Sequence, residues 1–166
     1  MPLTLWIHEF LHEVGACYSV IPHRPAYTAQ DEAAATHLPG REFAKVGICF
    51  IDDQPVQAVV PATLSVNVDR LLNLAGGRHI RLAEERDLRR LFPDCEIGAM
   101  PPFGPFYGQL VFVDVTLAAQ PEIAFNAGTH TEAICMRWAD FAKAIVPIVG
   151  NFAERPLNHV AAVRLA

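Results

Sequence analysis

The chain has 166 residues, of which 52% are apolar, enough to form one domain with its own hydrophobic core. Its net charge of −5 excludes the broad, non-specific nucleic-acid surface that strongly basic domains carry, and so argues against a general DNA-binding protein. Because every apolar run is much shorter than the about 20 residues of a membrane-spanning helix, and the first residues lack the basic start of a signal peptide, we expect a soluble, cytoplasmic protein with no membrane partner.

The N-terminal segments predict two helices and, between them, a short strand. Apolar residues recur at helical spacing over 3–14, and residues 17–21 favour a strand that the following prolines end. Thr28, together with Asp31 and Glu32, stands at the start of an alanine-rich segment, 29–37, and resembles a capping box. This pattern predicts the second helix.

Lys45 stands directly before an apolar run over 46–51, which predicts a strand covered on both faces. Lys45 and Lys143 are the only two lysines of the chain, so arginine supplies the ordinary surface positive charge. A compact ammonium at the edge of a core can hold an anionic substrate, and burial tunes its pKa. A lysine whose stem covers apolar surface while its ammonium reaches water explains the position equally well.

The middle of the chain predicts short elements that lead to a loop. A second apolar run over 56–60 follows an Asp-Asp turn, so the two runs predict an antiparallel hairpin. The next segments favour a helix over 69–74, a strand over 79–82 and a helix over 84–92.

Arginines gather between Arg70 and Arg90, where six of them accompany three acidic residues and leave a local excess of three positive charges. Such a segment suits either a local phosphate contact or a solvated helix face. Glu85 and Arg89 stand four residues apart, which favours the solvated helix face.

Residues 98–108 contain three glycines and three prolines, a composition that no helix or central strand tolerates. The segment therefore predicts a loop of fixed shape. Two roles are open for it: a rigid crossover packed on the core, or a site whose backbone N–H groups hold an oxyanion, carboxylate or phosphate.

The last third of the chain predicts strands followed by one helix. Strands are expected over 110–115, 123–125 and 133–136, a helix over 138–145, and one short strand or helix in the segment from 147 to the end. His130 lies in a glycine-containing turn between the last two strands, where loop side chains commonly reach a site.

Known catalytic motifs are missing. The only serines, Ser19 and Ser65, lie outside a G-x-S-x-G elbow. The four cysteines have neither C-x-x-C nor zinc-like spacing, so we expect reduced, mostly buried thiols. The histidines do not have metalloprotease spacing either. We therefore expect neither a protein nucleophile nor a metal or other cofactor.

Several short motifs nevertheless occur in an order that is specific when taken together. The sequence resembles the YbaK-like family of aminoacyl-tRNA deacylases, which are free-standing relatives of the editing domain inserted in bacterial prolyl-tRNA synthetases. The resemblance covers roughly residues 15–152. The motifs that carry it are His23-Arg-Pro-x-Tyr27-Thr28, Pro39-Gly40 with Ala44-Lys45, Val59-Val-Pro-Ala62, Gly98-Ala-Met-Pro-Pro-Phe-Gly104, Val113-Asp114 and Ala127-Gly128.

The resemblance implies a mixed α+β fold with a curved, largely antiparallel, barrel-like sheet surrounded by helices. It implies one domain over 1–166, with a helix over 3–14 before the deacylase domain and a tail over 153–166 after it. The implied activity is hydrolysis of the ester between a wrong amino acid and its tRNA.

The same resemblance implies a site. Lys45 would hold the terminal nucleotide or its phosphate, and N–H groups between Ala99 and Gly104 would hold the aminoacyl carbonyl as it becomes an oxyanion. Water, helped by the neighbouring ribose hydroxyl, would attack the ester. The implied catalytic residues are Lys45, Gly98, Ala99, Met100 and Gly104. The implied substrate-binding residues are His23, Tyr27, Pro61, Pro101, Pro102, Phe103, Gly128 and His130.

Departures from the family pattern leave the amino acid open. The alanyl-tRNA branch carries Asn directly after the lysine, whereas Val46 follows here, and the pattern of the cysteinyl-tRNA branch becomes Asn126-Ala-Gly-Thr-His130. The expected partner is the acceptor end of a mischarged tRNA, with a synthetase and a second copy of the chain as further candidates. The alternatives are a non-catalytic module that binds nucleotides, aminoacyl-adenylate-like ligands or a protein, and a hydrolase of small esters or thioesters.

Overall fold

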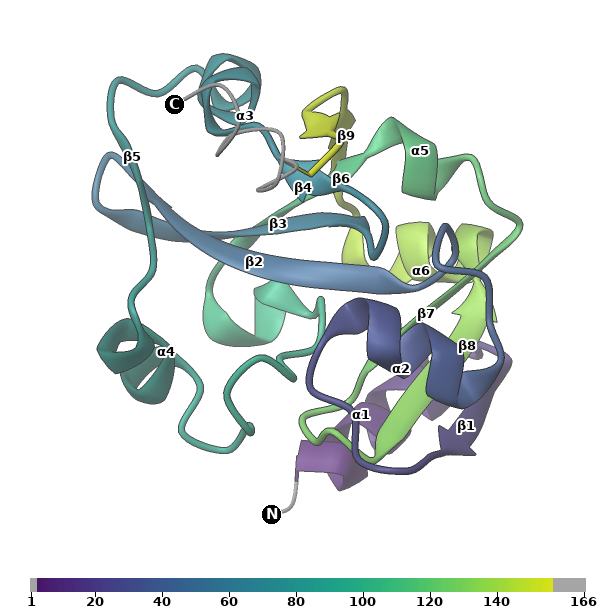
Figure 1. Ribbon diagram of the computed structural model, residues 1–166. Helices are drawn as coiled ribbons and strands as arrows, with labels where there is room; N and C mark the ends of the chain where they lie inside the picture. Colours follow the sequence, from purple (N-terminus) through teal and green to yellow (C-terminus); the bar gives the residue numbers. More distant parts are fainter. Residues whose placement is uncertain (1–2, 157–166) are drawn as a thin grey trace.

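A five-stranded sheet crosses the middle of the computed structural model, which describes residues 3–156 (Figure 1). Its strand order is β5-β2-β3-β6-β9. The five strands are β5 (Ile80–Leu82), β2 (Ala44–Ile51), β3 (Gln54–Pro61), β6 (Leu110–Asp114) and β9 (Ile148–Gly150). The pairs β2–β3 and β2–β5 are antiparallel, whereas β3–β6 and β6–β9 are parallel.

The predicted hairpin of β2 and β3 is confirmed. Its turn consists of Asp52 and Asp53, whose φ angles of 48° and 66° lie in the left-handed region that Asp tolerates better than most residues. The Asp52 carboxylate also accepts hydrogen bonds from the backbone N–H groups of Arg78 at 3.0 Å and His79 at 2.8 Å. One side chain thereby ties the turn to the segment that enters β5.

A three-stranded antiparallel sheet, β1-β8-β7, lies beside the larger one. Its strands are β1 (Tyr18–Pro22), β8 (Glu132–Arg137) and β7 (Glu122–Asn126), and a bridge between Phe43 and Ala124 connects it to the segment before β2. A short pair, β10 (Ala153–Glu154) with β4 (Ser65–Val66), completes the sheets. The mixed α+β fold with largely antiparallel strands is thus confirmed, and the strands described here do not close into a barrel.

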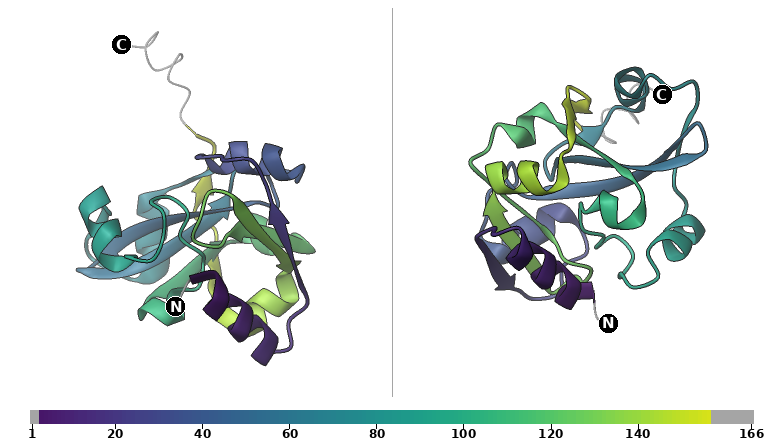
Figure 2. Two further views of the ribbon diagram at one scale, coloured as in Figure 1. Left: turned by 90° about the horizontal axis from the view of Figure 1, so that it is seen from below. Right: turned by 180° about the vertical axis from the view of Figure 1, so that it is seen from behind.

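Helices cover both faces of the two sheets. They are α1 (Leu3–Glu13), α2 (Ala29–Thr36), α3 (Val68–Ala75), α4 (Glu85–Leu91), α5 (Val115–Ala118), α6 (Trp138–Ile145) and the 3-10 helix η1 (Gly104–Tyr107). The views from below and behind show α1 and α6 on one side of β7 and β8 and α2 on the other (Figure 2). Among residues 3–156, no helix is long and apolar enough to cross a lipid bilayer.

Most predicted elements are confirmed to within two residues, and the exceptions are short. The α5 helix has only four residues and η1 forms within the glycine- and proline-rich loop, so neither produces a periodic pattern. The predicted pairing of Glu85 with Arg89 on α4 is present. Residues 157–166 of the predicted tail lie outside the described residues.

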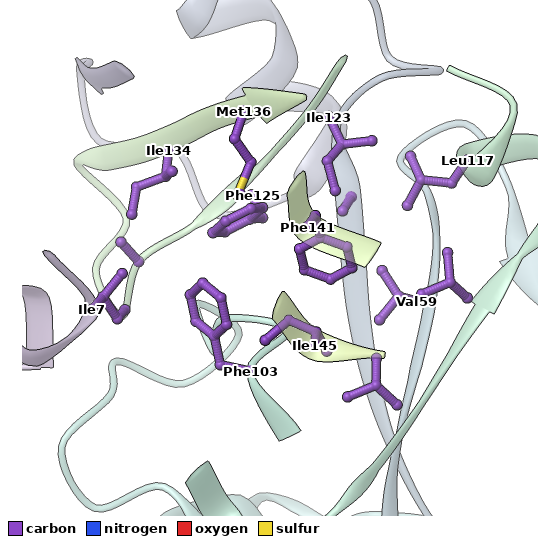
Figure 3. Close-up of a cluster of buried hydrophobic side chains, with 14 of the residues drawn as sticks. Ile7, Val59, Phe103, Leu117, Ile123, Phe125, Ile134, Met136, Phe141 and Ile145 are labelled. Atoms are coloured by element: carbon purple, nitrogen blue, oxygen red, sulfur yellow. The ribbon is translucent and has the colours of Figure 1, made fainter. Parts of the chain in front are cut away.

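Aromatic rings form the centre of the main hydrophobic core (Figure 3). Phe103, in the loop that joins α4 to β6, is fully buried, and its ring centroid lies 5.4 Å from that of Phe125 on β7 and 6.5 Å from that of Phe141 on α6. Ile7 and Ile145 approach the same rings from α1 and α6 in Figure 3. The second half of the loop is therefore anchored in the core.

Asp114 is a buried carboxylate that holds the C-terminal strands in place. It accepts hydrogen bonds from the backbone N–H of Phe152 at 2.8 Å and of Ala153 at 2.7 Å, and from both the N–H and the hydroxyl of Thr116. Burial alone would raise the pKa of Asp114, but these hydrogen bonds outweigh it and lower the pKa below 3.8. Asp114 therefore has a structural role.

Replacing Phe103 with alanine should strongly destabilise the protein, because the substitution leaves a cavity among rings that cannot fully relax. We expect Phe103→Ala to lower the free energy of unfolding by about 3–5 kcal/mol, measured by urea denaturation. Phe106→Ala is the matched control and should lower it clearly less, because Phe106 is 46% exposed. Equal losses for the two variants would contradict this account of the core.

Candidate functional site

A pocket of about 410 Å³ opens between α2, the start of β2 and the loop that follows α4. Mutually distant parts of the sequence meet there, and the pocket is large enough for a small ligand group. Its lining residues are Tyr27, Thr28, Ala29, Glu32, Ala44, Lys45, Val46, Gly98, Met100 and Asn126. Lys45 and the first half of the glycine- and proline-rich loop therefore belong to one cavity.

Lys45 supplies the positive charge of this pocket. It lies near the start of β2, where it pairs with Val60 of β3, and it also lines a smaller hollow together with Gln30 and Ala62. Partial burial lowers the pKa of the Lys45 ammonium below 10.5. Lys45 forms no ion pair within residues 3–156, so its charge is available to an anion.

Glu32 supplies a buried carboxylate to the lining of the same pocket. Its side chain is 2% exposed, and its two oxygens contact different partners. Oε1 lies 3.1 Å from Nδ1 of His130, and Oε2 accepts a hydrogen bond from Nδ2 of Asn126 at 2.7 Å. Helix α2, strand β7 and the turn before β8 are joined through this one side chain.

His130 connects the same carboxylate to the loop. Its Nε2 lies 2.8 Å from the carbonyl oxygen of Ile97, and because a carbonyl oxygen only accepts, Nε2 carries a proton. Nδ1 faces the carboxylate of Glu32, so one further proton is shared between these two groups. Both ring nitrogens of His130 are therefore engaged within the protein.

The pKa values of this pair are shifted in the same direction. Burial raises the pKa of Glu32 above 4.5, more than its hydrogen bonds lower it. Burial by itself would lower the pKa of His130, but the hydrogen bonds to Ile97 and Glu32 and the nearby carboxylates raise it above 6.5. The pair thus retains its shared proton more strongly than either group would in water.

The loop has two halves with different surroundings. Gly98 lies at the pocket with a φ of +86°, which disfavours any residue with a Cβ, and the ring of His130 packs against it. Gly104 lies in the core, where a Cβ would come within 2.5 Å of the carbonyl oxygen of Gln109. The first glycine shapes the site, whereas the second permits close packing.

Backbone hydrogen bonds hold the first half of the loop in place. The N–H of Ala99 donates to the carbonyl of Glu96 at 3.0 Å, and the N–H of Gly128 donates to the carbonyl of Ala99 at 2.9 Å. Within the described part of the chain, the N–H groups of Gly98 and Met100 donate to no protein acceptor. These two amides, unlike that of Ala99, therefore retain their hydrogen-bonding capacity within the described residues.

The remaining site residues suggested by the sequence lie at different depths. Tyr27 lines the pocket, 74% exposed, with its ring 5.0 Å from that of His130. His23 is half-buried outside the lining, with Nδ1 bonded to the carbonyl of Arg24. The others are buried behind the pocket or in the core, namely Pro61, Pro101, Pro102, Phe103, Gly104 and Gly128.

Sequence reasoning missed Glu32 and Asn126 as site residues. Glu32 was expected only as a helix-start residue, and Thr28 does cap α2 by accepting from the N–H of Asp31 at 3.1 Å. The inward direction of the Glu32 side chain left no signal in the sequence, because an acidic residue in a first helical turn is explained by the helix dipole. Asn126 was noted only as a departure from a family pattern.

The family model of the aminoacyl-tRNA editing domain matches residues 23–144, which include every element that lines the pocket. The chain belongs to this family. It is therefore a hydrolase of the aminoacyl-tRNA editing type, as the motifs around Lys45 and Gly98 predicted.

One curated protein and several solved structures are similar to this chain. The multifunctional Ser/Thr-tRNA deacylase ProXp-y of Escherichia coli (strain K12) is 29% identical over 150 residues, 86% of this chain and 87% of that protein. A crystal structure of a proposed trans-editing enzyme for prolyl tRNA synthetase superposes with a TM-score of 0.79 at 19% identity, covering 93% of this chain and 98% of that one. The crystal structure of a proposed signal transduction protein from Marinobacter aquaeolei VT8 superposes with a TM-score of 0.72 at 16% identity. The match covers 99% of this chain and 34% of that one. At such identities the two structures show the fold alone.

Replacing Glu32 with glutamine should lower the pKa of His130. The substitution removes the carboxylate that helps to raise this pKa and leaves the burial that lowers it. NMR titration of the His130 ring should therefore show a lower midpoint in Glu32→Gln than in the wild type. Glu122→Gln, at an exposed position, is the control and should leave the midpoint in place.

The same pair makes stability depend on pH in a defined direction. Because the folded-state pKa of His130 is raised, its contribution to stability is fully present below pH 6.5 and is lost as the pH rises through the folded-state pKa. The wild type should lose more stability than Glu32→Gln across that range, measured by thermal unfolding. Parallel pH profiles for the two proteins would contradict the pairing.

Proposed function

We propose that this chain is a trans-editing deacylase that hydrolyses the ester bond of a mischarged tRNA. The observation that carries the proposal is that one pocket is lined by Lys45, which forms no ion pair among residues 3–156, and by Gly98 and Met100, whose backbone N–H groups donate to no acceptor in the same range. An aminoacylated tRNA end presents phosphates and an ester carbonyl side by side, and these are the two chemistries that such a pocket would bind.

In the proposed reaction the chain supplies binding and electrostatic stabilisation. The Lys45 ammonium holds a phosphate oxygen of the terminal nucleotide, and the amides of Gly98 and Met100 donate to the carbonyl oxygen of the ester. As water adds to the carbonyl carbon, that oxygen gains negative charge, and the amides stabilise it more than they stabilise the ground state.

The proton balance of this reaction involves the tRNA. Water attacks with help from the neighbouring ribose hydroxyl, the bond between the carbonyl carbon and the ribose oxygen breaks, and a proton from the water goes to the departing oxygen. The products are the free amino acid and uncharged tRNA. His130 takes no part as a base in this scheme, because both of its nitrogens are already engaged.

Family membership and the name of the ProXp-y relative support this proposal. That relative is described as acting on Ser- and Thr-tRNA, so seryl and threonyl esters belong in any test panel for this chain. A mischarged tRNA is made by a synthetase in the cytoplasm, which is where we propose that this enzyme acts, with a synthetase as a candidate partner.

Replacing Lys45 with alanine should slow deacylation. The loss of one charged hydrogen bond, about 1.5–3 kcal/mol, corresponds to roughly a 10- to 100-fold lower kcat/KM. The measurement is release of labelled amino acid from a panel of mischarged tRNAs. The matched control is Lys143→Ala, because Lys143 is the only other lysine, is exposed on α6, and does not line this pocket.

The outcomes of this assay separate the possible functions. If the wild type hydrolyses no member of the panel but binds an aminoacyl-tRNA end, the chain is a binding module. If Lys45→Ala and the wild type react at equal rates, the role proposed for Lys45 is wrong.

The contribution of Lys45 should decrease at alkaline pH. Because burial lowers its pKa, the ammonium loses its proton at a lower pH than an ordinary lysine does. We expect the ratio of wild-type to Lys45→Ala rates to shrink as the pH rises from neutral toward 10.5. Spontaneous ester hydrolysis, measured without protein at each pH, is subtracted from both rates before the ratio is formed. A ratio that stays constant would show that the charge of Lys45 is not required.

A further inference from the structure

Asn126 lines the pocket and carries one hydrogen-bond acceptor that has no partner among residues 3–156. The side chain lines the cavity, and the residue is 6% exposed. Because the Glu32 carboxylate accepts, the atom of Asn126 that faces it must be the amide nitrogen, which fixes the orientation of the amide group. The amide oxygen, Oδ1, is buried and has no hydrogen-bond partner among residues 3–156.

A buried amide oxygen without a partner is unfavourable, and a ligand that brings a donor to it gains affinity over one that does not. The amide cannot simply rotate to relieve this, since rotation would place its oxygen against the carboxylate of Glu32 and break a 2.7 Å hydrogen bond. His130 holds Glu32 from the other side. Oδ1 therefore stays in one position.

The charge around Oδ1 favours a neutral donor. The Glu32 carboxylate contacts His130 through one oxygen and Asn126 through the other, while Lys45 adds a positive charge to the same cavity. An ammonium on the amino-acid side chain, in addition to the α-ammonium that every aminoacyl ester carries, would be repelled by that positive charge. A hydroxyl group meets no such repulsion, and the neighbouring Ala29, Ala44 and Val46 suit a small apolar stem.

We infer that Oδ1 of Asn126 accepts a hydrogen bond from the side-chain hydroxyl of the aminoacyl group, so that the pocket selects seryl and threonyl esters over the same skeletons without a hydroxyl. This inference rests on the proposed deacylase function and names its substrate class and specificity residue. Lys45, Gly98 and Met100 would treat all aminoacyl esters alike, and Asn126 discriminates among them.

The test uses pairs of tRNA esters that differ only by the hydroxyl: seryl against alanyl, and threonyl against 2-aminobutyryl, each on the same tRNA. We expect the wild type to prefer the hydroxylated member in kcat/KM by about tenfold or more, as for one hydrogen bond to a buried group. Asn126→Leu, which keeps the side-chain size without an acceptor, should bring both preferences close to one. Asn73→Leu, on the exposed surface of α3, should retain the wild-type preferences.

A second variant allows the inference to be tested even if Asn126→Leu does not fold. Glu32→Gln keeps the volume of the side chain, but a glutamine amide can both donate and accept, so it no longer fixes the orientation of Asn126. We expect the ratio of kcat/KM for the hydroxylated ester to kcat/KM for its partner to fall part of the way toward one in this variant. A thermal unfolding midpoint shows whether the variant is folded. If Glu32→Gln and Asn126→Leu slow all four esters equally, Asn126 contacts a group that all amino acids share, and the inference is overturned.

A binding measurement tests this inference independently of the proposed activity. The probes are adenosines whose 3′ oxygen is replaced by an amide-linked serine or alanine, which cannot be hydrolysed as esters. Tighter binding of the seryl probe, lost in Asn126→Leu, supports the inference even if the protein turns over no tRNA ester, a result that would refute the proposed function. Turnover of all four esters without a preference in rate or binding would refute the inference and leave the function in place.

Discussion

The contact between the Glu32 carboxylate and the His130 imidazole organises the site, because it joins elements that are far apart in the sequence. The two residues are 98 positions apart, and their side chains are almost completely buried. Through Nε2 of His130 the contact reaches the carbonyl of Ile97, and through Oε2 of Glu32 it reaches Asn126. Removing the Glu32 or the His130 side chain would leave a buried polar group without its partner. The contact therefore fixes the positions of α2, β7 and the loop around Ile97 relative to one another.

The loop between α4 and β6 combines two roles that its composition left as alternatives. Its first half lines the pocket with Gly98 and Met100, whose amides have no acceptor among residues 3–156, while its second half, with Phe103 and Gly104, packs into the main core. Anchoring one half restricts the movement of the other. A site that relies on backbone amides needs a loop of restricted movement. An amide stabilises a developing negative charge best when its N–H already points at the atom that gains the charge.

Much of the fold follows from local patterns. Local patterns predicted β2, β3 and most helices: the apolar run after Lys45, the Asp-Asp turn and the helical spacing of apolar residues. Such patterns arise because an element that buries one face needs apolar residues at the repeat of that helix or strand. The missed elements, such as α5 and η1, contain four residues each, which is too few for a period to appear. Lys45 could be singled out because lysine is scarce in this chain, whereas Glu32 looked like an ordinary acidic residue in the first turn of a helix.

The sequence by itself determined the family, the elements and the region of the site, because these depend on the order of motifs and on hydrophobic periodicity. Only the tertiary structure decided which side chains meet. Long-range pairing brought Glu32, Asn126 and His130 together and placed the Ala99 amide in an internal hydrogen bond, whereas the amides of Gly98 and Met100 have no acceptor in the part of the chain that the structure describes. The physical reason is that side-chain direction and hydrogen-bond partners are set by the packing of distant segments, and a local pattern carries no record of them.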